Sequence, residues 1–170
     1  DEFLNNYYRT QLSEQSKLNA QLDGLNDLAD ILNDLDDTGI DAQLSKFYEA
    51  LNNLNKYPAD STARTNFIET TKSLTSILNS KYAQLEENTS KALGDGKTDE
   101  SLKNSKIYVQ YSAFNNKLEE LAAVNKALIT TQTGTLEANN LLDKRDLILN
   151  DLAQFTNITV EEKHNGAVNV

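Results

Sequence analysis

Residues 33–47, NDLDDTGIDAQLSKF, begin like a calcium-binding loop between two helices. Asp34, Asp36 and Thr38 alternate and a glycine follows, and side-chain oxygens at alternate positions are the ligands with which such loops surround Ca²⁺. The pattern then fails, because position twelve, which needs a bidentate glutamate, is Ser45. The stretch therefore predicts a turn between two helices rather than a metal site.

Catalytic arrangements have no better basis. His164 is the only histidine and there is no cysteine, so histidine-pair metal sites, Ser–His–Asp triads and thiolate chemistry lack their residues. Adjacent carboxylates such as Glu119 and Glu120 point in different directions on a helix. A carboxylate metal site on facing helices needs Glu-x-x-His motifs, and His164 lies outside the predicted helices. We predict a protein that is not an enzyme and holds no metal or cofactor.

The charge balance restricts the partners. There are 26 acidic and 16 basic residues, for a net charge of −10. Such a surface repels phosphate backbones and anionic lipid, so we expect neither nucleic acid nor membrane as a partner. No apolar run approaches the roughly 20 residues of a spanning helix.

The composition favours long helices. One proline and six glycines occur in 170 residues, and 38% of the residues are hydrophobic, so the helices must have narrow apolar stripes. We predict an all-α fold, an elongated antiparallel helical bundle or coiled-coil-like rod, over residues 1–156. Its helices are expected at about residues 3–35, 41–56, 61–93, 100–132 and 141–155, with Asp41 as the cap of the second.

Two of these helices carry clear heptad patterns. In the first, apolar residues spaced four, three, four and three predict the seam of a helix pair: Leu18, Leu22, Leu25, Ala29 and Leu32. The fourth predicted helix continues the same spacing from Ile107 to Leu128, and a seam asparagine, Asn125, is expected to fix its register.

Beyond residue 156 the period changes. The segments ITVEEK, HNG and AVNV predict a short β-hairpin over residues 157–170 with its turn at Asn165-Gly166. Because the second strand stops at the last residue, we expect this hairpin to begin a further, truncated domain.

Three clusters are candidate structural motifs. Phe47, Tyr48 and Leu51 are expected in the core. In YPADSTAR, Pro58 opens a turn, Asp60 can cap the next helix, and Arg64 can reach back to a carboxylate.

In LLDKRD, polar groups sit on a short helix that a leucine pair anchors. Asp143, Arg145 and Asp146 are expected to clamp this helix, with Leu142, against the rod. For this cluster and for YPADSTAR, a capping and ion-pair role is favoured over a binding site.

Taken in order, these segments resemble one family. GIDAQLSKFYEALNNLNKYPADSTARTNFIETTKSL, LEELAAVNKALI and ANNLLDKRDLILNDLAQFTNITV follow the pattern of flagellar hook-associated protein 1, which forms the hook–filament junction. DEFLNNYYRTQL resembles the family's amino-terminal Asp-x-Phe-Leu segment. The resemblance spans nearly the whole chain.

The resemblance implies the amino-proximal helical rod of a larger axial protein of the bacterial flagellum. Such a protein is extracellular, is exported through the flagellar secretion system without a cleaved signal, and self-assembles. Its expected partners are copies of itself and the axial proteins on the hook and filament sides, and an export chaperone is a further candidate. The alternative is another helical extracellular protein, either flagellin-like, hook-cap-like or an adhesin stalk, acting as a binding module.

Overall fold

The computed structural model describes residues 2–32, 39–164 and 166–170. Within these ranges it contains the helices α1 (Glu2–Leu32), α2 (Ile40–Lys56), α3 (Ser61–Leu93), α4 (Asp99–Lys103), α5 (Lys106–Thr130) and α6 (Leu136–Phe155), and the strands β1 (Glu161–Glu162) and β2 (Val168–Asn169).

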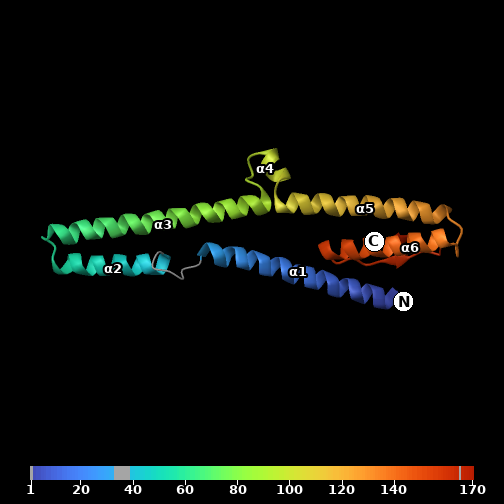
Figure 1. The fold of residues 1–170 in the computed structure, drawn as a ribbon, viewed down its shortest axis with the longest axis horizontal. Helices are drawn as coiled ribbons and strands as arrows, with labels where there is room; N and C mark the ends of the chain where they lie inside the picture. Colours follow the sequence, from blue (N-terminus) through green and yellow to red (C-terminus); the bar gives the residue numbers. More distant parts are fainter. Residues whose placement is uncertain (1, 33–38, 165) are drawn as a thin grey trace.

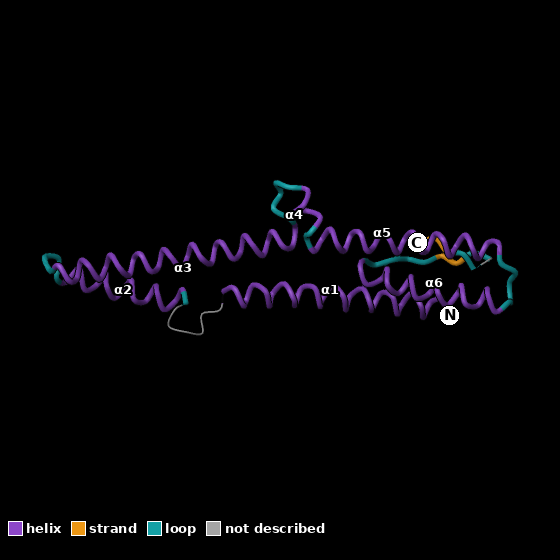
Figure 2. The backbone as a smooth tube through the Cα atoms, turned by 45° about the horizontal axis from the view of Figure 1, so that its top comes forward, coloured by secondary structure: helices purple, strands orange, loops and turns teal. Residues whose placement is uncertain are grey.

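The molecule is an elongated helical rod, as predicted. In Figure 1, α3 and α5 follow one another along one side of the rod, and α2 lies antiparallel beside α3 at one end. At the other end α6 packs against both α5 and α1, and Figure 2 shows the same arrangement from a second direction. The two termini lie at this end.

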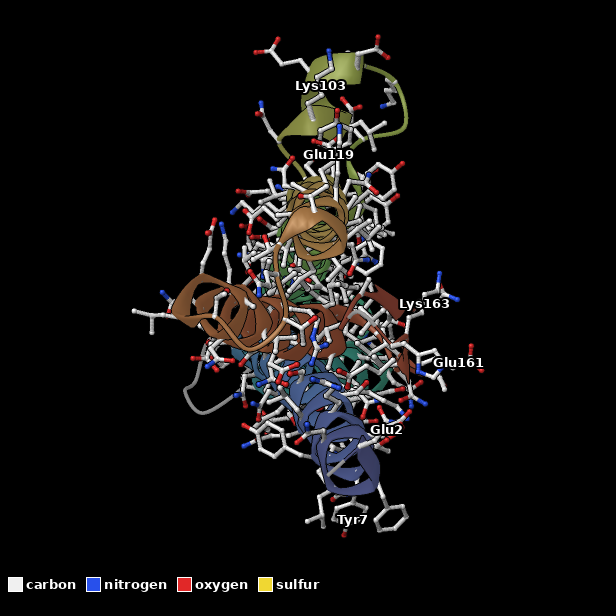
Figure 3. All side chains as sticks on the ribbon, turned by 90° about the vertical axis from the view of Figure 1, so that its right-hand side faces the viewer. Glu2, Tyr7, Lys103, Glu119, Glu161 and Lys163 are labelled. Carbon is white, nitrogen blue, oxygen red and sulfur yellow. The ribbon has the colours of Figure 1, made fainter. Side chains whose placement is uncertain are left out.

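The prediction of one helix over residues 100–132 is wrong, because Ser105 divides it. The Ser105 hydroxyl oxygen accepts a hydrogen bond from the Tyr108 amide at 3.3 Å and so caps α5. The hydroxyl itself donates to the Leu102 carbonyl oxygen at 2.6 Å. The short α4 therefore leaves the rod axis as a knob, which carries Lys103 in Figure 3.

The knob packs closely on the end of α3. Gly94 has a φ of 84°, and a Cβ atom there would lie 2.9 Å from the Leu102 Cα. Because of the positive φ and this contact with the backbone, a larger residue at position 94 would require the chain to rearrange.

Two other helix starts differ from prediction. The helix expected from residue 141 begins at Leu136, because the Thr135 hydroxyl accepts from the Ala138 amide at 3.2 Å and caps it. The N-cap of α2 is Gly39 and not Asp41. Asp41 lies in the first turn, where a negative charge favours the positive end of the helix dipole.

The main core lies where α5, α6 and the hairpin meet. Leu149, Leu152 and Ala153 of α6 are completely buried. They belong to a cluster that also includes Leu121, Val124 and Leu128 of α5, and Ile158, Val160 and Val168 of the C-terminal segment. The hairpin's inward residues thus share the core of the helices, and the domain boundary expected at residues 156–157 stays a prediction.

The predicted hairpin is present and antiparallel. Glu161 pairs with Asn169 and Glu162 with Val168. Gly166 has a φ of 78°, and its amide donates to the Lys163 carbonyl oxygen at 2.9 Å. Asn165, the other residue of the predicted turn, lies outside the described residues.

Candidate functional site

The heptad row of α1 faces solvent and forms no seam within the described chain. Its leucines are 48–64% exposed, and Ala29 is exposed as well. This correction has a simple geometric cause, because α1 rests on the rod through its opposite face. We call this row the α1 ladder: Leu18, Leu22, Leu25, Ala29 and Leu32.

The flanks of the α1 ladder carry no charge. On a heptad helix the residues beside such a row are here Asn19, Gln21, Asn26 and Leu28, all exposed. In a chain with a net charge of −10, this is a surface that another acidic protein can approach with little repulsion. Exposed apolar rows of this kind mark interaction surfaces.

A second group of exposed apolar residues, mostly aromatic, lies near the N-terminus of α1. Phe3 is 75% exposed, Leu4 and Tyr7 are 58% exposed and Tyr8 is 56% exposed. Viewed along the rod in Figure 3, Tyr7 lies on the edge opposite the knob that carries Lys103. Exposed apolar side chains thus also lie in the first turns of α1, and residues 9–17, where no large apolar side chain is exposed, separate them from the α1 ladder.

The second helix also buries less than predicted. Phe47 is half-buried against Phe67, with ring centroids 5.4 Å apart, but Tyr48 and Leu51 are 55% and 39% exposed. Their expected place in the core is wrong, because α2 packs mainly on α3 and one helix buries only a narrow strip of another.

The predicted corner between α2 and α3 is built as a capped turn. The Asp60 carboxylate accepts from the Thr62 amide at 2.7 Å and caps α3. Arg64 reaches back as expected, but its Nε donates to the carbonyl oxygen of Pro58 at 2.8 Å instead of to a carboxylate. A role for this corner in setting the angle between the helices stays a prediction.

The LLDKRD segment holds the hairpin through one arginine. Arg145 is 6% exposed, and its Nη1 donates to Glu162 Oε1 at 3.1 Å and to the Gly166 carbonyl oxygen. Its Nη2 donates to Asp146 Oδ1 at 3.0 Å. Leu142 is half-buried beside the core, whereas Asp143 is exposed. The clamping role expected for these four residues remains a prediction, and Asp143 contributes no described contact to it.

A second buried arginine was not predicted. Arg9 of α1 is 4% exposed, and it donates to Asn150 Oδ1 at 3.2 Å and to Asp146 Oδ1 at 3.4 Å. Burial lowers the pKa of Arg9, and the Asp146 charge opposes that change. Arg9 and Arg145 thus share one carboxylate oxygen.

Asn125 has a different role from the one predicted. Its side-chain amide donates to the Val168 carbonyl oxygen at 2.9 Å, and its Oδ1 accepts from the Val168 amide at 3.0 Å. The side chain therefore satisfies both backbone groups of a strand residue. It fastens the hairpin to α5 and does not set the register of a helix seam.

The residues considered for chemistry do not assemble into a reactive site in the described ranges. No group of three or more potential metal ligands is found among them, and His164 is exposed beside the hairpin turn. The calcium-loop residues Asp34, Asp36 and Thr38 lie outside the described part of the chain. No described helix has both the length and the hydropathy for crossing a bilayer.

A helical rod with an exposed heptad row has a surface suited to packing against another helix. The chain belongs to the family of the helical domain of the flagellar hook-associated protein FlgK, whose model matches residues 25–170.

Among individual proteins, the chain is similar to flagellar hook-associated protein 1 of Bacillus subtilis strain 168. The two are 24% identical over 167 residues, which cover 98% of this chain and 31% of that relative. The chain thus spans about a third of the relative's length. No solved structure matches it.

Proposed function

We propose that the chain is the helical rod of a flagellar junction protein that connects hook to filament by joining the axial tube. The exposed α1 ladder, in a chain of this family, is the observation that carries the proposal. An exposed heptad row with uncharged flanks is suited to packing against a helix. This role depends on the shape of the rod and requires no chemical reaction.

The proposed partners follow from this role. Copies of the same protein and the axial proteins on the two sides of the junction would cover the outward helix faces, and an export chaperone would cover them before assembly. The proposed location is the extracellular flagellum, reached through the flagellar secretion system without a cleaved signal.

The test places the full-length gene product, carrying a small tag, in cells that lack their own copy. We expect label confined to the hook tip and restored filaments. Label along the whole filament would favour a flagellin-like role, and label over the cell surface away from flagella would favour an adhesin. Either result would overturn the junction proposal.

The role of the α1 ladder is tested with Leu25→Glu in the same cells. We expect hooks without filaments, because a charge in an apolar contact between helices is costly. Leu136→Glu is the matched control, since Leu136 is also exposed (77%) but lies at the start of α6. Normal filaments in the Leu25→Glu strain would show that the α1 ladder is not part of the assembly interface.

A further inference from the structure

We propose that the C-terminal hairpin is a clasp that holds α1 on the rod, so that release of the hairpin also releases the first half of α1. This inference rests on contacts within the chain and goes beyond the junction role. It holds or fails independently of where the protein acts in the cell.

The attachment of α1 to the rod end is largely polar. The α1 ladder faces away from the rod, and the contacts of the first half of α1 centre on Arg9, which reaches Asn150 and Asp146 of α6. One turn earlier, the Asn6 amide donates to the Val160 carbonyl oxygen at 3.4 Å. Leu12 adds apolar contact with the core. One of these contacts is to the C-terminal segment itself.

The hairpin in turn is fastened to two other helices. Asn125 of α5 holds both backbone groups of Val168. Arg145 of α6 holds Glu162 and the carbonyl oxygen of Gly166. Gly166 fits closely here, since a Cβ atom on it would lie 2.8 Å from Leu142 Cδ2.

The two attachments meet at Asp146. Its Oδ1 accepts from both Arg9 and Arg145, and both guanidinium groups are buried. When the hairpin leaves, Arg145 loses Glu162 and Gly166 and has only Asp146 nearby. The contacts that hold the Arg145 guanidinium in place are then lost, and with them the second anchor of the Asp146 oxygen that accepts from Arg9. Asn6 loses the Val160 carbonyl at the same time. Release of the hairpin therefore weakens both polar attachments of α1.

Hydrogen exchange of the chain, followed by mass spectrometry, tests this coupling. The decisive variant is Asn125→Leu, which removes two hydrogen bonds to the hairpin and leaves Asn6, Arg9 and their hydrogen-bond partners unchanged. We expect exchange about tenfold faster in residues 158–169 and also in residues 6–16, with α2 and α3 unchanged. Asp146→Asn, which weakens both arginine contacts directly, should give the same pattern.

Two further variants keep the test interpretable. Glu162→Gln removes only an ion pair whose glutamate is 46% exposed, so it should fold and show a smaller form of the same pattern. Asp151→Asn is the control. Asp151 lies on α6, as Asp146 does, but it pairs with Lys117 of α5 at 3.1 Å and takes no part in the clasp. This substitution should leave residues 6–16 and 158–169 unchanged.

Two results would overturn the clasp. In the first, the Asn125→Leu hairpin exchanges faster while residues 6–16 keep their protection, so the hairpin and α1 are separate units. In the second, all helices including α2 and α3 accelerate equally, so the variants act on global stability alone.

Discussion

The two ends of the rod are built on different physical principles. Where α6 lies between α5 and α1, Leu149 and Leu152 are completely buried, and buried polar groups tie three helices to a hairpin. Where α2 faces α3, the fully buried hydrophobic residues are two alanines, Ala50 and Ala63.

Only the end that contains α6 therefore has a core of its own. A pair of helices that buries so little depends on caps, helix propensity and further packing partners. The end with α6 should keep its structure in isolation, while the α2–α3 end should be the first to open.

A substitution in the core of the well-packed end should lower the free energy of unfolding the most. Leu149→Ala should lower the free energy of unfolding by about 2–5 kcal/mol, because it removes buried methyl groups and leaves a cavity. Leu51→Ala, at a 39% exposed leucine of α2, should cost less than about 1 kcal/mol. Urea unfolding followed by circular dichroism measures both. Similar losses would mean that the two ends have equally developed cores.

An intermediate effect tests how closely α2 and α3 approach. Ala63 is 2% exposed, so Ala63→Leu should force the helices apart and cost about 1–3 kcal/mol. Ala29→Leu on the exposed α1 ladder is the control and should change stability little. If Ala63→Leu proves neutral in the same unfolding measurement, the α2–α3 contact is looser than described.

A smaller effect concerns the corner. Asp60→Ala should cost about 1 kcal/mol through loss of the cap on α3, and Asp60→Asn should retain most of the stability because asparagine also caps. Arg64→Ala should cost less, because the hydrogen bond from Arg64 to the Pro58 carbonyl oxygen is exposed. The measurement is the rate of amide hydrogen exchange in the first turn of α3. If this rate in all three variants equals that of the unsubstituted chain, the result would contradict a structural corner.

The smallest effect lies between the two ends, in the loop before α4. The pKa of Asp95 is below its ordinary value of 3.8 because the amides of Lys97 and Thr98 donate to its carboxylate. A lowered carboxyl pKa contributes stability above the ordinary value, and this contribution is lost as pH falls through the folded-state value. Asp95→Asn should therefore narrow the difference between melting temperatures at about pH 5 and about pH 2.5. An unchanged difference would show that this loop adds no pH dependence.

Local signals in the sequence predict the helices well. The bounds of α3 match the expected 61–93 because Asp60 provides a cap and Gly94 a stop, and both act within one turn. The division at Ser105 was missed because serine is unremarkable in a heptad pattern until its hydroxyl is seen capping a new helix.

The side-chain contacts that join distant segments could not be predicted in the same way. A heptad row predicts the seam of a helix pair but does not say whether the partner helix lies in the same chain, and the α1 ladder has no such partner within the described residues. Arg9 meets Asp146, and Asn125 meets Val168, across more than 40 residues in each case. Such pairs have no characteristic spacing, and only the three-dimensional arrangement brings them together.

The knob at α4 has a consequence for how this protein can vary. Because α3 and α5 run on along the same side of the rod and the chain between them loops outward (Figure 1), residues added at the loop tip would enlarge the protrusion and leave the span of the rod unchanged. A lattice that depends on a fixed repeat distance could thus tolerate insertions here while rejecting them within either long helix, where one added residue rotates everything beyond it by roughly 100°.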